Sequence, residues 1–299
     1  MEYILQTNNL SKVYGTKTVL NDVSIHVPKG SIYGLVGKNG AGKTTLMRII
    51  CGLTQQSAGN YTLLGKSNDD SARNRMGILI EKPGIYEHMT ATENLRYFSL
   101  LFGIPSPDYD KILKMVGLQN AGKKKARTFS LGMKQRLGIA VALAGDPDFL
   151  VLDEPVNGLD PQGIIEIREL ILKLNRERKI TFLISSHILD ELSRLATHYG
   201  FIDSGRIVRE VSAKELEEAS RRGMHLEVTD LSALVRVLEA RDMEYAVTSA
   251  SGADVFGSWD VTELVLALEK EGCKIKQMAE KDESLESYYI NLMGGESHA

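Results

Sequence analysis

A glycine-rich loop between an apolar run and an amphipathic run constrains this chain more than any other feature. Ser31–Val36 is a short apolar segment bounded by glycines, which is typical of a buried strand, and the run after Gly42 has helical periodicity and ends at Gly52. The loop between them reads Gly37, Lys38, Asn39, Gly40, Ala41, Gly42, Lys43 and Thr44, the pattern G-x-x-x-x-G-K-[ST]. A strand, this loop and a helix in that order predict an α/β domain with a phosphate-binding loop.

The residue types in the loop each have a physical role in holding phosphates. Glycines let the backbone bend around the anion with its N–H groups inward, and the following helix presents the positive end of its dipole to the same place. Lys43 would reach the β- and γ-phosphates, and the Thr44 hydroxyl would bind Mg²⁺. The strand before the loop and the helix after it argue against a chance glycine-rich turn.

A second acidic element follows the apolar run Phe149–Leu152, which ends in Asp153 and Glu154. A buried strand carries such residues to its C-terminal end, where ligands collect in open α/β sheets. Asp153 would assist Mg²⁺, and Glu154 would orient or deprotonate the attacking water. An Asp-Glu pair alone often merely ends a strand, but the phosphate-binding loop upstream favours the catalytic interpretation.

Further strand-like and helix-like segments alternate along the first part of the chain. Tyr3–Thr7, Val23–Val27 and Ile180–Ile184 have the length and character of strands, and the alternation predicts a mostly parallel sheet covered on both faces. The composition changes around residues 208–214, and from Met224 onward the order is strand, helix, two strands, helix, strand and a closing helix over residues 284–294. That order predicts a small α+β ferredoxin-like domain. We therefore expect domains at 1–210 and 222–299, with a linker at 211–221.

Composition and charge exclude several classes of protein. The 299 residues are 43% hydrophobic and 25% charged, as in ordinary globular domains. The longest apolar stretch, Leu137–Gly145, is too short to span a bilayer, and the N-terminal segment lacks the pattern of a signal peptide. Only two cysteines, Cys51 and Cys273, occur, which excludes a disulfide framework and favours a reducing, cytosolic setting.

The charge is uneven: residues 1–210 carry +6 and residues 211–299 carry −9, giving the net −3 of the whole chain. The acidic end argues against a nucleic-acid partner. A basic run at residues 123–127 is interpreted as a solvated loop, although it could also hold an anion.

Four further features indicate one family. Ser130-Leu131-Gly132-Met133-Lys134-Gln135-Arg136 is similar to the signature motif of ATP-binding-cassette (ABC) ATPases, usually LSGGQ-x-QR. Asn157-Gly158-Leu159-Asp160 resembles their D-loop, His187 their switch histidine, and Tyr14 the aromatic residue that stacks on adenine. The resemblance covers about residues 1–210, and it implies a P-loop NTPase of the ABC-ATPase type. Such a protein has a RecA-like α/β core, an antiparallel β subdomain and a helical signature subdomain.

The resemblance also implies roles for individual residues. Two copies of the chain would enclose two ATP molecules, with the signature residues of one copy facing the γ-phosphate bound by the other. His187 would hold the γ-phosphate. Independently of the resemblance, Ser130 could simply cap the helix that begins near Gly132, which is compatible with that helix N-terminus facing the γ-phosphate. The implied contacts to ATP within one chain are Tyr14, Gly37, Lys38, Asn39, Gly40, Ala41, Gly42, Lys43, Thr44 and Thr45. Ordinary packing of Tyr14 and burial of His187 remain the alternatives.

Two positions depart from the family pattern. Leu131 replaces the usual first glycine of the signature, while Gly132 remains and allows close approach of a phosphate. Glu81 stands where the family has a glutamine at a strand end, and it would offer a carboxylate to Mg²⁺ or to the attacking water. The alternative for Glu81 is a strand-end carboxylate that faces solvent. The implied metal ligands are thus Thr44, Asp153 and Glu81.

The segment after Glu81 and the acidic C-terminal domain resemble one branch, the bacitracin- and lantibiotic-resistance ATPases. That branch implies an exporter whose ATPase subunit lies at the cytoplasmic face of the membrane and powers a separate multi-helix permease. The permease would dock near residues 81–100, where Tyr86, Met89, Tyr97 and Phe98 could form an apolar groove. The alternatives are an exporter of another drug, an ion or a lipid, a soluble ABC ATPase without a transport role, and a binding or sensor module.

Overall fold

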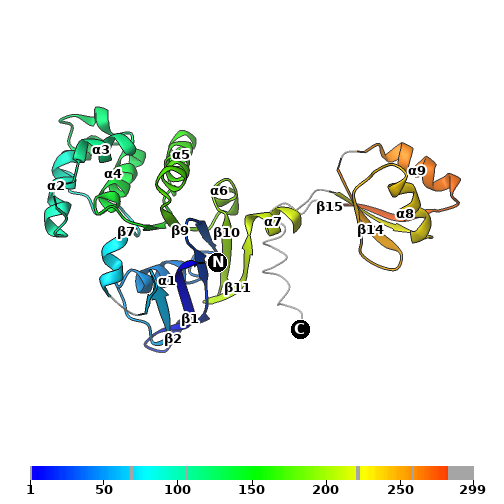
Figure 1. Cartoon of the computed structure of the whole chain (residues 1–299), viewed down its shortest axis with the longest axis horizontal. Coiled ribbons are helices and arrows are strands. Elements are labelled where there is room, and N and C mark those ends of the chain that lie inside the picture. Colours follow the sequence, from blue (N-terminus) through cyan, green and yellow to red (C-terminus); the bar gives the residue numbers. More distant parts are fainter. Residues whose placement is uncertain (1, 68–69, 106, 220–222, 258, 282–299) are drawn as a thin grey trace. The chain divides into compact units, whose positions relative to one another are not determined.

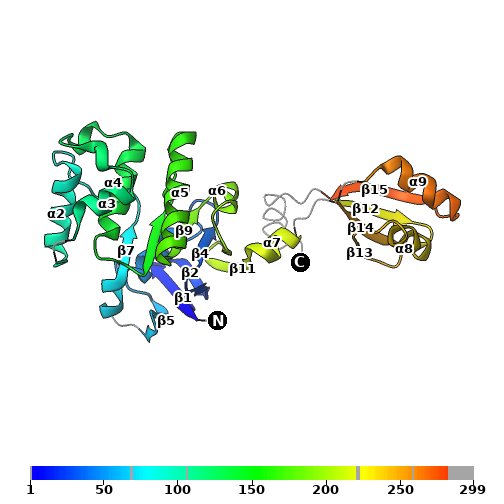
Figure 2. The same cartoon turned by 45° about the horizontal axis from the view of Figure 1, so that its top comes forward.

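The computed structural model describes residues 2–67, 70–105, 107–219, 223–257 and 259–281 of the chain. It divides into two compact units, Met1–Ala213 and Lys214–Ala299. Figure 1 shows the elements of each unit, and Figure 2 shows the same elements from a second direction.

The first unit is built on a six-stranded sheet with the strand order β11-β10-β4-β9-β8-β7. Its strands are β4 (Ile32–Val36), β7 (Met76–Leu79), β8 (Phe149–Asp153), β9 (Thr181–Ser186), β10 (His198–Asp203) and β11 (Arg206–Ser212). Every neighbouring pair is parallel except β10 with β11. All residues of β4, β8 and β9 are buried, which explains their continuous apolar runs. The predicted, mostly parallel sheet is confirmed.

A second, antiparallel sheet lies in the same unit. It comprises β1 (Tyr3–Tyr14), β2 (Lys17–Val23), β3 (His26–Pro28), β5 (Ala58–Leu63) and β6 (Lys66–Ser67). The single strand predicted for Val23–Val27 is wrong, because β2 ends at Val23 and β3 begins at His26. The buried Thr7 hydroxyl occupies this break: it donates to the Val23 carbonyl at 3.0 Å and accepts from the Ile25 N–H at 2.9 Å.

Helices complete the core of the first unit. Helix α1 (Lys43–Ile50) packs Leu46, Met47, Ile49 and Ile50 into a core that also contains side chains of both sheets. Helix α6 (Leu189–Ser193) lies on the other face of β4, where the space beside Gly34 is filled by Leu192. Figures 1 and 2 show α5 (Pro161–Arg178) beside α6. The sheet is therefore covered on both faces, as predicted.

The helical subdomain is formed by α2 (Ala91–Leu101), α3 (Tyr109–Met115) and α4 (Leu131–Leu143), which contact one another (Figure 1). Short 3₁₀ turns at Gln119–Ala121 and Ala126–Thr128 connect α3 to α4, and another spans Asp70–Arg75. Helix α4 also packs against β7, the edge strand of the parallel sheet. This arrangement agrees with the three subdomains that the resemblance implied.

The boundary between the units differs from the predicted one. β11 pairs with β10 as far as Ser212, so residues 211 and 212 belong to the first sheet and not to a linker. The next residues, Ala213–Ala219, form α7. The composition change at residues 208–214 contains the boundary between the units, but the last strand of the sheet continues past residue 210 to Ser212.

The second unit has a four-stranded antiparallel sheet with two helices. Its elements are β12 (Gly223–Val228), α8 (Leu231–Glu239), β13 (Tyr245–Val247), β14 (Gly252–Phe256), α9 (Val261–Lys270) and β15 (Ile275–Lys281), and the strand order is β13-β14-β12-β15. The predicted element order is confirmed up to β15, and the predicted closing helix at 284–294 lies outside the described residues. Both helices pack on the same side chains of β12 and β14 to make a separate core.

None of the helices in the described part of the chain combines the length and the apolar character required to cross a bilayer.

Candidate nucleotide-binding site

The glycine-rich loop connects β4 to α1 at the C-terminal edge of the parallel sheet. Gly40 and Gly42 have left-handed φ angles of 84° and 111°, which L side chains rarely adopt. A Cβ atom at Gly42 would lie 2.7 Å from a Leu20 methyl, and one at Gly37 would overlap the Ile202 carbonyl oxygen. The loop therefore requires glycine at these positions both for its turns and for its close packing.

The first turn of α1 is open to an anion. Its N-cap is Gly42, which supplies no side-chain hydrogen bond to the free N–H groups. The first turn contains no acidic residue, so the positive end of the helix dipole is not offset there. These N–H groups and the dipole together favour a phosphate at this point.

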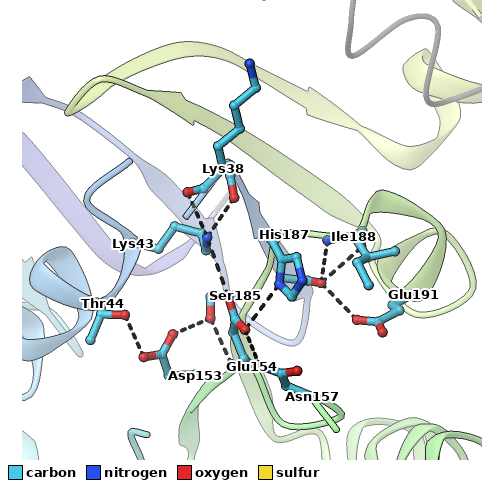
Figure 3. Close-up of polar contacts among 12 residues, drawn as sticks. Lys38, Lys43, Thr44, Asp153, Glu154, Asn157, Ser185, His187, Ile188 and Glu191 are labelled. Atoms are coloured by element: carbon cyan, nitrogen blue, oxygen red, sulfur yellow. Dashed lines mark hydrogen bonds and ion pairs between the residues drawn. The ribbon is translucent and has the colours of Figure 1, made fainter. Parts of the chain in front are cut away.

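Lys43 lies at the base of the loop with its side chain only 5% exposed. Its Nζ donates to the carbonyl oxygens of Gly37 at 2.6 Å and Lys38 at 3.2 Å, and it lies 3.7 Å from Glu154 Oε1. Burial lowers the pKa of the Lys43 ammonium, while the neighbouring Glu154 and Asp153 carboxylates partly raise it. The Lys38 side chain points away from this cluster (Figure 3). The loop thus holds one buried cation, that of Lys43, against its own carbonyl groups.

Asp153 lies at the end of β8 and is 5% exposed. It accepts a hydrogen bond from the Thr44 hydroxyl at 2.8 Å and another from the Ser185 hydroxyl on β9. A carboxylate with two hydroxyl groups is a set of hard oxygen donors, the type that Mg²⁺ prefers together with phosphate oxygens and water. The residues at this point therefore fit a magnesium ion.

Glu154 follows Asp153 with a left-handed φ of 46°, a conformation that costs a non-glycine residue free energy. Its N–H donates to the Ser185 hydroxyl at 2.9 Å, which helps to stabilise this turn. Its carboxylate accepts a hydrogen bond from Asn157 Nδ2 at 2.9 Å and lies 3.2 Å from His187 Nδ1 (Figure 3). The left-handed turn thus directs the Glu154 carboxylate toward Lys43 and His187.

His187 lies close to Glu154 without a directed hydrogen bond at Nδ1. Although Nδ1 lies within 3.2 Å of Glu154, this buried atom has no hydrogen-bond partner in the part of the chain that the structure describes. The ring itself remains 31% exposed. The structure therefore brings together Lys43, Glu154 and His187 from three separate elements.

The signature segment begins α4. Ser130 is the N-cap and its hydroxyl accepts from the Met133 N–H at 3.2 Å, which confirms the predicted capping role. The side chain of Leu131 is 49% exposed and borders Gly158, where a Cβ would lie 3.4 Å from Leu131 Cδ2. No polar contact among the described residues joins this segment to Lys43 or Thr44, so one chain does not bring the signature to its own loop.

The D-loop lies between β8 and α5. Asp160 caps α5 by accepting from the Gly163 N–H at 3.0 Å, and Asn157 contacts Glu154 as described above. Leu159 lies next to Gly132, at 3.9 Å from the position of a Cβ there. Of the remaining signature residues, Gln135 is buried and Met133 is partly buried. Signature and D-loop therefore contact each other within one chain.

Tyr14 and Glu81 have their own contacts outside the group formed by Lys43, Asp153, Glu154 and His187. Tyr14 ends β1 with a side chain that is 46% exposed, and Lys12 Nζ lies 4.7 Å from its ring centroid. Glu81 follows β7 with a φ of 63°, and its carboxylate forms an ion pair with Arg48 on α1. Neither residue makes a polar contact with Asp153 or Glu154 in the described part of the chain.

Comparison with known proteins identifies the family. Residues 20–157 match the ABC transporter family. The bacitracin transport ATP-binding protein BcrA of Enterococcus faecalis is 40% identical over 301 residues, which cover 99% of this chain and 98% of that protein. The chain belongs to the ABC transporter ATP-binding proteins. The lantibiotic transport ATP-binding protein SrtF of Streptococcus pyogenes is 43% identical over 69% of this ABC ATPase and 90% of its own length.

Solved structures show the same fold. A nucleotide-free ATP-binding cassette from an ABC transporter is 28% identical with a TM-score of 0.64, covering 72% of this chain and 93% of its own. The dimeric bacterial ABC transporter cassette MJ0796 is 25% identical with a TM-score of 0.63, and the match covers 70% of this chain and 98% of that chain. This ABC ATPase therefore binds and hydrolyses ATP.

Sequence reasoning missed two side chains in the site of this ABC ATPase. Ser185 contacts both Asp153 and the Glu154 N–H, and a signal for it existed, because Ile184-Ser185-Ser186-His187 ends the strand that pairs with β8. Arg48 contacts Glu81, and no local pattern indicated it, since the two residues are 33 positions apart.

Proposed function

We propose that this ABC ATPase powers a membrane exporter that removes bacitracin-type or lantibiotic peptides from the cell that carries it. One observation carries the proposal: at the C-terminal edge of one parallel sheet, four side chains lie close together, those of Lys43, Asp153, Glu154 and His187. BcrA is a bacitracin transport ATP-binding protein and SrtF a lantibiotic transport ATP-binding protein, which supports the substrate class. In this proposal the protein binds to the cytoplasmic face of the membrane through a permease.

Lys43 and the N–H groups of α1 bind the β- and γ-phosphates of ATP, which replace the loop carbonyls and Glu154 as partners of the Lys43 ammonium. Thr44, Asp153 and Glu81 would hold Mg²⁺, which would offset phosphate charge. Glu154 accepts a proton from the attacking water as general base. His187, 3.2 Å from Glu154, binds the γ-phosphate.

A second copy of the chain completes each site. Ser130, Leu131, Gly132, Met133 and Gln135 belong to this proposed contact in trans. The exposed start of α4 supports it, because Leu131 is 49% exposed and the signature makes no polar contact with its own loop among the described residues. ATP binds the closed pair more tightly than the open one, and hydrolysis removes that preference.

The permease docks on the helical subdomain. A cavity of about 670 Å³ lies between β7, α4 and the end of α2, where Phe98, Phe102 and Ile104 form part of its lining. Beside it, Leu100, Leu101 and Phe102 are between 60% and 73% exposed. Contiguous exposed apolar side chains of this kind mark interaction sites.

An aromatic group continues this surface toward residue 86. Tyr86 and Tyr97 lie edge to face with ring centroids 4.6 Å apart, and Phe98 lies 5.8 Å from Tyr86. Met89 is partly buried beside the start of α2. A helix of a permease loop with an apolar face would cover these side chains.

The test of catalysis uses Glu154→Gln in the purified full chain. We expect ATP hydrolysis to fall by a factor of about 10²–10⁴, because the general base is lost while charge-assisted phosphate contacts remain. Size-exclusion chromatography with light scattering should then show an ATP-dependent dimer. Glu169→Gln on the exposed side of α5 makes the same change outside the site and should hydrolyse ATP at the parental rate.

A strain that lacks the chain tests the substrate class. Complementation with the parental chain should restore growth on bacitracin or a lantibiotic, and complementation with Glu154→Gln should not. An unrelated drug serves as the control. Hydrolysis by Glu154→Gln at the parental rate would refute the catalytic role, whereas equal growth with and without the chain would refute only the proposed substrate.

A further inference from the structure

The Glu81–Arg48 ion pair joins the edge of the parallel sheet to the helix that follows the phosphate-binding loop. Glu81 is the second residue after β7, and Arg48 lies in the last turn of α1. Arg48 Nη2 donates to Glu81 Oε1, with the two side chains 42% and 58% exposed. Ion pairs this exposed contribute little to folding stability. The helix α1 is instead held by its buried residues Leu46, Met47, Ile49 and Ile50.

Arg48 also lies on the same helix as Thr44, a proposed metal ligand. On α1 it follows Thr44 by four residues, so the two side chains share one face of the helix about one turn apart. Both are only partly buried, while the residues between them, Leu46 and Met47, face the core. Thr44 in turn donates to Asp153. A carboxylate that pairs with Arg48 is therefore held at the helix face that also carries the Thr44–Asp153 contact.

The charge at this point differs from that of a site with an amide at position 81. Asp153 and Glu154 already place two carboxylates beside Lys43, and ATP adds further negative charge. A third carboxylate at Glu81 would repel ATP unless a cation offset it. Among the described residues, the cation in contact with Glu81 is the Arg48 guanidinium.

We infer that Arg48 is a positioning residue that competes with Mg²⁺ for the Glu81 carboxylate, an inference that rests on the proposed role of Glu81 as a metal ligand. Arg48 keeps Glu81 neutralised and turned toward α1 while the site lacks nucleotide. When Mg²⁺ and ATP bind, Glu81 leaves Arg48. The strength of the Arg48–Glu81 ion pair thus sets the Mg²⁺ concentration at which the site is half-saturated. Because Glu81 follows β7 and precedes the proposed permease contact, the ion pair also links metal binding to that segment.

The experiment measures the affinity of the full chain for a fluorescent ATP analogue in excess Mg²⁺ and in EDTA. The affinity in Mg²⁺ divided by the affinity in EDTA gives the contribution of the metal. A change of charge that affects nucleotide binding equally with and without Mg²⁺ cancels in this ratio. Arg48→Gln should raise this ratio by about two- to fivefold, the range of an exposed ion pair. Glu81→Gln should lower it, and Arg48→Lys should leave it near the parental value because the charge remains.

The double variant Arg48→Gln/Glu81→Gln decides the mechanism, because Arg48 should have no effect once the carboxylate is gone. Arg96→Gln, an exposed arginine on α2, removes the same charge elsewhere and should leave the ratio unchanged. Thermal unfolding of every variant checks that the fold is retained.

The outcomes separate the two proposals. If Glu81→Gln lowers the ratio but Arg48→Gln leaves it unchanged, or raises it by the same factor when Glu81→Gln is also present, the role of Arg48 is overturned and that of Glu81 stands. If Glu81→Gln leaves the ratio unchanged, the metal role of Glu81 is overturned and the inference with it. If the parental chain does not bind the analogue, the proposed function itself fails.

Discussion

At the scale of single residues, the site depends on a buried cation held by backbone carbonyls. Lys43 is 5% exposed and donates to Gly37 and Lys38, so its ammonium is already directed into the loop before nucleotide binds. We predict that Lys43→Ala weakens ATP binding by a factor of about 10–100, since a charge-assisted hydrogen bond contributes about 1.5–3 kcal/mol. Isothermal titration calorimetry measures this loss. Lys173→Ala, an exposed lysine on α5, serves as the control, and equal affinities of the two variants would contradict the prediction.

The same residue predicts a pH dependence. Burial lowers the pKa of Lys43 below the 10.5 of an ordinary lysine, so the folded protein releases this proton at a lower pH than the unfolded chain does. Between the folded and unfolded pKa values the unfolded chain binds more protons, so the Lys43 contribution to the free energy of unfolding rises with pH. ATP affinity should fall over the same alkaline window, because only the charged form attracts phosphate.

Lys43→Arg is the matched variant for the pH experiment, since arginine stays protonated throughout this range. Its ATP affinity should be lower overall but should not fall with pH in the window where the parental affinity falls. Parallel pH profiles of the two proteins would show that another group is responsible.

At the scale of elements, a partly buried hydrogen-bond network connects the strand before the loop to the last strand of the sheet. Tyr33 on β4 donates to Glu210 on β11 at 2.6 Å across β10, and Glu210 also accepts from the His26 N–H at 2.8 Å. A Cβ at Gly200 on β10 would overlap the Tyr33 hydroxyl. We predict that Gly200→Ala destabilises the fold by about 1–3 kcal/mol, the cost of overpacking.

Urea unfolding measures this change in the free energy of unfolding. Gly84→Ala is the control, because its Cβ would meet nothing within 4 Å and its φ is not left-handed. If Gly200→Ala unfolds at the parental urea concentration, Tyr33 can move without cost and the network does not hold β4 in place.

At the scale of the whole molecule, two units have separate cores. The core of the second unit is formed by side chains of its own sheet and of α8 and α9. All described residues of the proposed ATP site belong to the first unit. We predict that a chain ending at Ala219 binds ATP with parental affinity but changes in dimer stability or in permease-stimulated hydrolysis. Calorimetry and light scattering of the truncated chain test this, and a folded truncation that has lost ATP binding would refute it.

Much of the first unit was predictable, because its function is carried by short local patterns. The loop needs glycines at particular positions, and Gly40 and Gly42 show the left-handed backbone that explains them. Buried parallel strands need continuous apolar runs, so β4, β8 and β9 were found within one or two residues. The break at residues 24 and 25 was not predictable, since it depends on the hydroxyl of Thr7 on a neighbouring strand.

The sequence by itself determined the phosphate-binding loop, the acidic strand end and the family, because each depends on residue types at fixed local spacing. Only the tertiary structure decided which side chains meet across the sheet. Ser185 contacts Asp153 because β8 and β9 pair in a particular parallel register, and Leu131 borders Gly158 because the start of α4 packs on the loop before α5. Glu81 pairs with Arg48 for the same reason: such contacts depend on how elements distant in the sequence pack, and spacing along the chain does not encode that.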